Sequence, residues 1–327
     1  MKILVIGAAG MIGRKLVGAL LERGHLGGEA INGLTLVDIV APERPATFPS
    51  AKTIAADLSA PGSAVTLLED RPDVIFHLAA IVSGEAEADF DKGYRINLDG
   101  TRYLLEAIRQ AGQGGAYRPR LIFTSSIAVF GEPLPAEIPD EQALTPLTSY
   151  GTQKAIGELL LADYSRRGFV DGIGIRLPTI AIRPGKPNKA ASGFFSGIIR
   201  EPLAGIEAIL PVSEDVRHWF ASPRAAVNFL VHAAEMDSSS LGQRRSLTMP
   251  GLAATVGEEI AALRRVAGDK AVSLIRHEPD PVIAGIVAGW PQAFSANRAL
   301  ALGFAAETSF DDIIRAYIED ELDGRVG

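Results

Sequence analysis

The sequence contains no cysteine. A chain without thiols forms no disulfide, has no thiolate nucleophile and binds no metal through sulfur. This absence is compatible with a reducing cytoplasm. The five histidines stand at positions 25, 77, 218, 232 and 277 and match no HExxH or similar spacing, so we predict no metal site. His77 follows apolar residues and is expected to be a hydrogen-bonded structural histidine.

The sequence also lacks a long uninterrupted hydrophobic run. The uncharged stretch 282–297 is broken by two glycines and a proline, and it is shorter than the roughly 20 residues that a spanning helix needs. The apolar run at the start of the chain ends at Arg14, and no convincing cleavage pattern follows it. We therefore expect an unprocessed cytoplasmic protein that does not enter a membrane.

Basic residues are outnumbered by acidic ones. The chain has 32 Lys and Arg against 39 Asp and Glu, a net charge of −7, which argues against an electrostatic nucleic-acid binder. Hydrophobic residues make up 47% of the 327 residues and charged residues 22%, so disorder is excluded as the main state. The length suits a large α/β unit with a smaller lobe.

Short β-rich runs alternate with helical patterns in the first half of the chain. The expected strands are 2–6, 34–38, 52–55, 73–77, 120–124 and 172–176, and the expected helices are 11–23, 63–69, 91–111 and 149–167. Most of the strand runs are nearly continuously apolar, as in strands covered on both faces of a parallel sheet. The repetition predicts an α/β fold with a Rossmann-type doubly wound parallel sheet.

The alternation weakens after residue 176. Residues 177–191 contain three prolines and are typical of a loop that leaves the sheet. A helix expected at 223–235 has the apolar spacing to return to the sheet, and further helices are expected at 255–267 and 310–322. We predict a Rossmann domain over 1–176, to which 223–236 returns, and a smaller α+β lobe over 177–327.

A glycine-rich turn, GAAGMIG, follows the first expected strand and leads into a helix. Glycines permit a tight turn and let backbone N–H groups at a helix start approach a pyrophosphate. The spacing is GxxGxxG rather than the commoner GxGxxG. The turn could bind nothing, but the flanking strand and helix favour a dinucleotide site whose candidate contacts are Gly7, Gly10, Met11, Ile12 and Gly13.

Asp38 ends the second expected strand. A carboxylate at this place can accept hydrogen bonds from a ribose diol and would repel a 2′-phosphate, which favours NAD over NADP. The alternative is an aspartate that only starts a turn. The Rossmann domain would then bind NAD, and the lobe over 177–327 would mainly bind substrate.

Further cofactor candidates follow the third and fourth expected strands. Asp57 and Leu58 come after the third, where an acidic side chain could face the adenine amine. Leu78, Ala79 and Ala80 come after the fourth, and the two alanines leave room for a cofactor against the backbone. Carboxyl ends of strands are where such sheets bind their ligands.

Tyr150 and Lys154 stand four residues apart on an expected helix, so their side chains point from one face. A nearby ammonium favours a phenolate, and the pair could exchange a proton with a hydroxyl group during oxidation or reduction. A surface lysine beside a half-buried tyrosine is the alternative. A serine after the fifth strand, Ser126 or Ser125, could orient the substrate oxygen.

In combination these motifs resemble the extended short-chain dehydrogenase/reductase superfamily, the NAD-dependent epimerases, dehydratases and dehydrogenases. The matching elements are residues 7–13, 57–58, 77–80, 97, 124–131, 150 with 154, and 176–179. The resemblance implies that Tyr150 is the catalytic acid/base and that Lys154 holds the nicotinamide ribose. Ser126 matches the hydroxyl position of the family's Ser-Ser-x-x-Val-Tyr-Gly pattern, in which Phe130 replaces the usual tyrosine, and Ser125 is a second claimant to that role. The resemblance adds three cofactor contacts, Asn97, Pro178 and Thr179.

Residues 80–90, 183–193 and 219–224 resemble runs of sugar-acid dehydrogenases in that group. This likeness implies oxidation of the C2 hydroxyl of a four-carbon sugar acid by NAD⁺ to a 2-oxo acid. A substrate carboxylate needs a cationic or donor-rich clamp. The candidate substrate contacts are Ser83, Ser126, Tyr150, Arg183, Asn188 and Arg217.

Two other functions fit the same motifs. A nucleotide-sugar epimerase would need a larger pocket in the second lobe, whereas a dehydratase is disfavoured because Ile127 and Ala128 replace the usual Asp-Glu pair. A non-catalytic NAD-sensing protein is disfavoured because such proteins tend to lose the Tyr/Lys pair. The helices at 91–111 and 149–167 would suit a homodimer contact, as in related enzymes.

Overall fold

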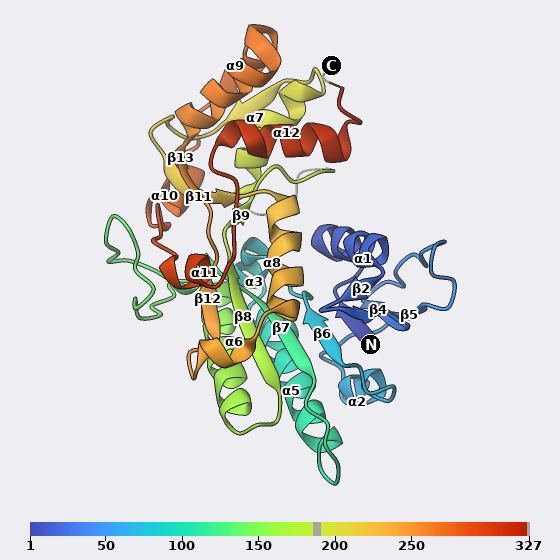
Figure 1. Cartoon of the computed structure of the whole chain (residues 1–327). Helices are drawn as coiled ribbons and strands as arrows, with labels where there is room; N and C mark the ends of the chain where they lie inside the picture. Colours follow the sequence, from blue (N-terminus) through green and yellow to red (C-terminus); the bar gives the residue numbers. More distant parts are fainter. Residues whose placement is uncertain (186–190, 326–327) are drawn as a thin grey trace. The chain divides into compact units, whose positions relative to one another are not determined.

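The computed structural model describes residues 1–185 and 191–325 (Figure 1). The chain forms two compact units. The first comprises residues 1–129, 148–176 and 227–247, and the second comprises residues 130–147, 177–226 and 248–327. Among the described residues, no helix combines the length and the apolar character that crossing a membrane requires.

A seven-stranded sheet with the order β12-β8-β7-β6-β1-β4-β5 is the centre of the first unit. The strand pairs β1–β4, β1–β6, β4–β5 and β6–β7 are parallel. The strands are β1 (Lys2–Ile6), β4 (Gly33–Asp38), β5 (Lys52–Ala55), β6 (Val74–His77), β7 (Arg120–Ser126), β8 (Asp171–Leu177) and β12 (Ser246–Thr248). This order, with the chain reversing direction across the sheet at β1, confirms the predicted Rossmann-type doubly wound fold.

Both faces of this sheet are covered. Leu4 and Ile6 of β1 belong to a buried core with residues of α2, α5 and α6, whereas Ile3 and Val5 point to the other face and are also buried. An ion pair between Arg23 of α1 and Glu235 of α8, at 2.6 Å, joins two further helices. Nearly continuous apolar strands are therefore the expected composition for this sheet.

The helices and shorter elements of the first unit have the following bounds. The helices are α1 (Met11–Arg23), α2 (Ser63–Leu67), α3 (Ser83–Ala88), α4 (Phe90–Gly93), the π-helix η1 (Tyr94–Asp99), α5 (Gly100–Ala111), α6 (Ser149–Arg166) and α8 (Pro223–Glu235), whose first turn belongs to the second unit. The short elements are β2 (His25–Leu26), β3 (Glu29–Ala30), η2 (Ile127–Val129) and η3 (Ser238–Leu241).

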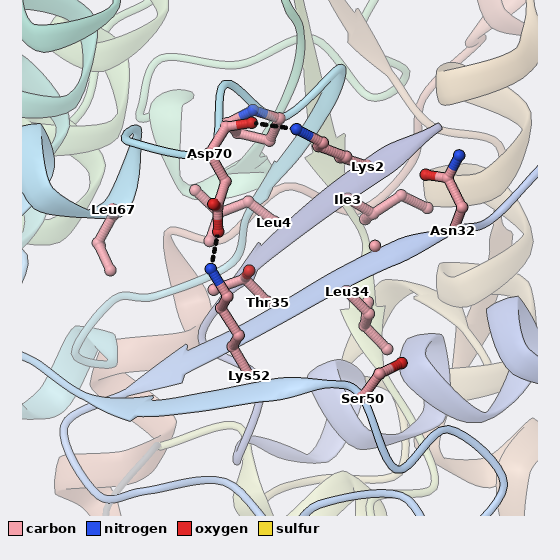
Figure 2. A pocket seen from close by; sticks show the side chains of 12 residues that line it. Lys2, Ile3, Leu4, Asn32, Leu34, Thr35, Ser50, Lys52, Leu67 and Asp70 are labelled. Atoms are coloured by element: carbon pink, nitrogen blue, oxygen red, sulfur yellow. Dashed lines mark hydrogen bonds and ion pairs between the residues drawn. The ribbon is translucent and has the colours of Figure 1, made fainter.

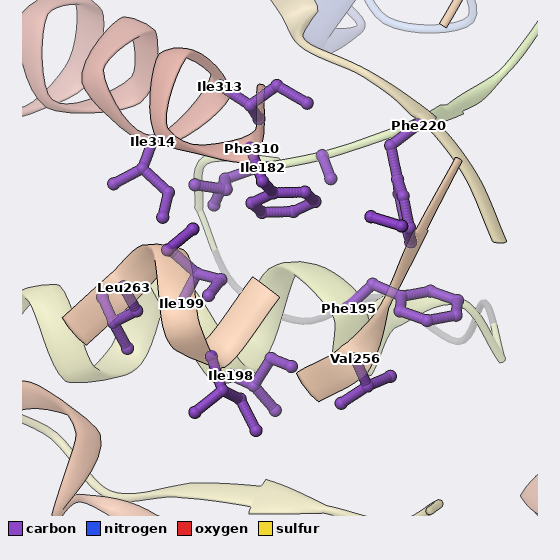
Figure 3. Close-up of a cluster of buried hydrophobic side chains, with 14 of the residues drawn as sticks. Ile182, Phe195, Ile198, Ile199, Phe220, Val256, Leu263, Phe310, Ile313 and Ile314 are labelled. Carbon is purple, nitrogen blue, oxygen red and sulfur yellow. The ribbon is translucent and has the colours of Figure 1, made fainter. Parts of the chain in front are cut away.

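The second unit is built from two small sheets and helices around its own core. A three-stranded sheet has the order β13-β11-β9, and β10 pairs with β14. Figure 3 shows the core, in which the rings of Phe195, Phe220 and Phe310 lie among aliphatic side chains of α7, α9 and α12. Its elements are β9 (Thr179–Ile180), β10 (Ala208–Leu210), β11 (Arg217–Ala221), β13 (Leu252–Thr255), β14 (Ile275–His277), α7 (Gly193–Leu203), α9 (Val256–Val272), α10 (Pro281–Ala288), α11 (Asn297–Ala301) and α12 (Phe310–Glu321).

Two expectations from the sequence were wrong. The single helix expected over 91–111 is interrupted by the π-helix η1 and divides into three elements. The stretch 177–191, expected to be a loop, contains the strand β9 within its described part, and α7 follows it at Gly193. The second difference has a physical reason, because β9 is formed by its pairing with β11, which local propensity does not contain.

Candidate active site

The glycine turn after β1 has room only for glycine at two positions. Gly7 has φ +95°, and a Cβ there would lie 2.7 Å from the backbone nitrogen of Ala79. A Cβ on Gly13 would lie 2.1 Å from the carbonyl oxygen of Gly7. The turn is therefore packed backbone to backbone against the segment after β6, which brings two groups of predicted cofactor contacts together.

The start of α1 is open to an anion. No side chain caps the helix at Gly10, and its first turn contains no acidic residue, so the N–H groups of Met11 and Ile12 retain the positive end of the helix dipole. Nearby, the carboxylate of Asp38 accepts hydrogen bonds from the backbone N–H groups of Ala9, at 2.9 Å, and Ile39, at 2.7 Å. A turn rich in glycine and alanine, a helix N-terminus and a carboxylate fit the pyrophosphate and ribose of a dinucleotide.

Asp57 is held by its neighbours. Its Oδ1 accepts hydrogen bonds from the backbone and the hydroxyl of Ser59, and its Oδ2 lies 2.9 Å from Nη1 of Arg95. Burial alone would raise the pKa of Asp57, but the hydrogen bonds from Ser59 and Arg95 outweigh burial and lower the pKa below its ordinary value. The carboxylate is therefore charged and fixed in orientation, and Leu58 beside it is buried.

His77, at the end of β6, is buried and hydrogen-bonded within the first unit. Its ring lies within the sheet core, and Nε2 is 2.9 Å from the hydroxyl of Thr101. Thr101 donates its proton to the carbonyl of Asn97, so the ring must donate from Nε2. Burial and the charge of Lys154 lower the pKa of His77 to about 3, which keeps the ring neutral. Leu78, Ala79 and Ala80 follow it and are half-buried.

Tyr150 and Lys154 lie together on the first turns of α6. Thr148 caps this helix by accepting the N–H of Gly151 at 3.0 Å. Lys154 is buried, donates from Nζ to the carbonyl of Thr124 at 2.7 Å and has its Nζ 5.7 Å from the centre of the Tyr150 ring. Burial lowers the pKa of Lys154 to about 8 although the charge of Glu158 opposes the shift. The structure thus brings the Lys154 ammonium and the Tyr150 ring together, as their spacing on the helix predicts.

The structure gives the two candidate serines different environments. Ser125 is buried, and its hydroxyl donates to Oε1 of Glu158 at 2.6 Å. Ser126, the last residue of β7, is half-buried, and its Oγ accepts the N–H of Ala128 at 3.2 Å. The two side chains differ because successive strand residues point to opposite faces of the sheet. Ser125 uses its hydroxyl proton in the bond to Glu158, whereas the Ser126 contact leaves the hydroxyl proton available.

Glu158 is a site neighbour that the sequence reasoning missed. Its carboxylate lies in the core of the first unit and is held by Arg176, from Nε at 2.9 Å and Nη2 at 2.7 Å. The available signal was its position four residues after Lys154 on the same helix face. The carboxylate of Glu158 thus lies one helical turn after Lys154.

Two predicted cofactor contacts begin the second unit. Pro178 is buried and Thr179, the first residue of β9, is half-buried. The hydroxyl of Thr179 lies 2.7 Å from Nε2 of His218, whose Nδ1 lies 2.8 Å from the carbonyl oxygen of Pro291. A carbonyl only accepts, so Nδ1 carries the ring proton and Nε2 accepts from Thr179. Burial lowers the pKa of His218 to about 4, which keeps this arrangement at neutral pH.

The predicted substrate cations have partners within the second unit. Arg183 donates from Nε to the carbonyl of Ile180 at 2.9 Å and from Nη2 to Ser192 at 2.6 Å. Arg217 donates to the carbonyl of Ala253 at 3.2 Å and lies 3.4 Å from Glu258. Ser83 starts α3 in the first unit. Asn188 lies outside the described residues.

A pocket of about 210 Å³ lies elsewhere on the first unit (Figure 2). It is lined by the first residues of β1, β4 and β5, which are Lys2, Gly33 and Lys52. Asp70 accepts hydrogen bonds from both of these lysines, through its carbonyl oxygen and its carboxylate. The pocket is thus at the amino end of the strands, opposite the carboxyl edge at which doubly wound sheets bind their ligands. In the described part of the chain, no cluster of three His, Asp or Glu side chains could hold a metal ion.

The chain is similar to known proteins over nearly its whole length. The chain is 51% identical over 98% of both sequences to a Cupriavidus necator protein named D-erythronate dehydrogenase. It is 43% identical to a Haemophilus influenzae protein of the same name, over 98% of this chain and all of that protein. A crystal structure described as a nucleoside-diphosphate-sugar epimerase from Agrobacterium tumefaciens is 66% identical, with a TM-score of 0.98 over 100% of this chain and 96% of that one.

Residues 3–242 match the NAD dependent epimerase/dehydratase family. The match spans most of the chain and confirms the predicted family and, with it, the predicted cofactor NAD. The chain belongs to the NAD dependent epimerase/dehydratase family.

Proposed function

We propose that the chain is a dehydrogenase that oxidises the C2 hydroxyl of D-erythronate to the 2-oxo acid with NAD⁺. The observation that carries the proposal is the placement of the buried Lys154 ammonium 5.7 Å from the Tyr150 ring, on the helix that follows the Ser126 strand. The two full-length relatives named D-erythronate dehydrogenase support the choice of substrate.

The chain's own residues account for the movement of the proton. Tyr150, as a phenolate favoured by Lys154, would accept the proton of the substrate hydroxyl, and Ser126 would donate a hydrogen bond that orients the same oxygen. When bound, NAD⁺ would supply the acceptor for the hydride from C2. The carbon–oxygen single bond thereby becomes a carbonyl, and the proton remains on Tyr150 until solvent removes it.

The turn from Gly7 to Gly13 and Asp38 would hold the dinucleotide in the first unit, with Asp57, Leu58, Leu78, Ala79, Ala80 and Asn97 as further contacts. Pro178 and Thr179 are further proposed cofactor contacts. Ser83, Arg183, Asn188 and Arg217 are proposed to bind the sugar acid. A small-molecule substrate, a cytoplasmic location and a homodimer complete the proposal, and light scattering of the purified protein tests the last.

The proposal is tested with purified protein, NAD⁺ and the stereoisomers of erythronate and threonate. We expect NADH absorbance to rise with D-erythronate. Tyr150→Phe should lower kcat by about 10²–10⁴-fold because it removes the proton acceptor, while NADH titration by fluorescence shows unchanged binding. Unchanged kcat in this variant contradicts the assignment.

A nucleotide-sugar epimerase is the second candidate, supported by the description of the Agrobacterium tumefaciens structure. An epimerase returns its hydride to the substrate, so it yields no net NADH. Incubation with a UDP-hexose, followed by chromatography of the sugars, separates the two functions. Epimerised sugar without oxidation of any sugar acid would replace the first proposal with the second.

A further inference from the structure

Asn97 holds both backbone groups of one residue in the segment after β6. It lies in the π-helix η1 and is buried. Its Oδ1 accepts the N–H of Ile81 at 2.9 Å, and its Nδ2 donates to the carbonyl of Ile81 at 3.3 Å. π-helical turns are frequent at functional sites, and this one brings an amide side chain to the Ala80–Ser83 region.

The same Asn97 amide reaches α6. Its Nδ2 also donates to Oε1 of Gln153 at 2.8 Å. The orientation of both amides follows from one fact, that a backbone N–H only donates. The atom of Asn97 that faces the N–H of Ile81 must therefore be oxygen, the other must be nitrogen, and Gln153 must present its oxygen to it.

The other end of the Gln153 amide has no partner. Gln153 is completely buried, and its Nε2 makes no hydrogen bond with the described residues. A Cβ at position 93 would lie 2.6 Å from this nitrogen, so Gly93 provides the space that it occupies. A buried donor without an acceptor lowers stability. An apolar side chain of similar length would avoid this cost. The hydrogen bond that the Gln153 oxygen accepts from Asn97 therefore explains why an amide stands at position 153.

The Asn97–Gln153 contact connects the two segments on which the proposed chemistry depends. Ile81 follows Ala80, a proposed cofactor contact, and Gln153 immediately precedes Lys154 on α6. We propose that Gln153 is a positioning residue that, through Asn97, fixes the Ile81 backbone relative to Tyr150 and Lys154. The inference rests on the proposed function, because it assumes that both segments face the reacting groups.

The test is Gln153→Met, which keeps the length of the side chain and removes its hydrogen bond. We expect kcat for D-erythronate to fall about tenfold or more, because small misplacements of reacting groups are costly. KM for NAD⁺ should change little, and the melting temperature should stay the same or rise. Amide hydrogen exchange of the peptide that contains Ile81 should accelerate in the free protein.

The matched control is Gln110→Met on the exposed surface of α5, where the side chain donates to Glu106. This variant should leave kcat and the exchange of the Ile81 peptide unchanged. If Gln153→Met does not fold, Gly93→Ala displaces the same amide from its other side and should accelerate the same exchange.

Wild-type kcat together with wild-type exchange at Ile81 in a folded Gln153→Met protein would overturn the inference. Loss of the proposed function has a different signature, since wild type would then produce no NADH from any sugar acid. The exchange measurement needs no substrate, so it decides whether Gln153 orders Ile81 in either case.

Discussion

The buried ion pair between Glu158 of α6 and Arg176 of β8 allows a quantitative prediction. The two side chains are 4% and 11% exposed, and Arg176 reaches the carboxylate with Nε at 2.9 Å and Nη2 at 2.7 Å. Ser125 adds a hydroxyl donor at 2.6 Å. Arg176→Met would leave the carboxylate of Glu158 buried without its cation.

Removing one partner of a buried pair costs about 3–5 kcal/mol, because the remaining charge is neither solvated nor compensated. We therefore expect Arg176→Met to lower the free energy of unfolding by this amount. The double variant Arg176→Met with Glu158→Met replaces both charges by apolar groups. Its loss of unfolding free energy should be smaller than that of the single variant. The remaining loss comes from the unpaired hydroxyl of Ser125 and from the Lys154 ammonium, which no longer interacts with the charge of Glu158.

The assay is urea unfolding followed by circular dichroism at neutral pH. The matched control is Arg166→Met, which removes an exposed pair with Asp163 on the same helix, where both side chains are 58% exposed. That pair should contribute less than about 1 kcal/mol. The reasoning is refuted if Arg176→Met loses no more stability than Arg166→Met, or if the double variant is as unstable as the single one.

Three further predictions concern the turn, the lysine and the serines. Gly13→Ala should destabilise the protein by about 1–3 kcal/mol and abolish NADH binding measured by fluorescence. In the same helix, a Cβ on Gly18 would have no neighbour within 4 Å. Gly18→Ala should therefore stabilise the protein by up to ~1 kcal/mol. The pKa of Lys154 is lowered from 10.5 to about 8, so between these pH values the unfolded chain binds more protons than the folded protein. The free energy of unfolding of wild type should therefore rise by about 3 kcal/mol relative to that of Lys154→Met as the pH increases across this window, as measured by urea unfolding. Ser126→Ala should lower kcat about 10²-fold or more in the NADH assay, while Ser125→Ala should keep kcat and lose about 2 kcal/mol of stability; the reverse pattern would exchange their roles.

The sequence predicted the first unit well because its elements are strongly periodic. β1, β5, α1 and α8 have the expected bounds. The π-helix at Tyr94–Asp99 could not be predicted, because an additional residue in a helical turn leaves no clear mark on hydrophobic spacing. In the second unit the prolines near residue 184 predict a long loop, and the sequence pattern does not predict the helix that begins at Gly193.

The motifs predicted candidate site residues but not the polar partners of these residues. The bond between Ser125 and Glu158 joins residues 33 positions apart, and that between Asn97 and Gln153 joins residues 56 apart. Such contacts depend on how α6 packs on the sheet, which spacing along one chain does not contain. The different hydrogen-bond partners of Ser125 and Ser126 likewise could not be read from their adjacent positions in the sequence.

The alternation of β7 makes the site sensitive to the frame of a single strand. The hydroxyl of Ser125 is buried and bonded to Glu158, whereas that of Ser126, the next residue, is half-buried. Sliding this strand by one residue against its neighbours would turn each side chain to the opposite face. Insertions before Arg120 should therefore be tolerated, whereas a single deletion between Arg120 and Ser125 would turn the proposed catalytic hydroxyl of Ser126 to the buried face.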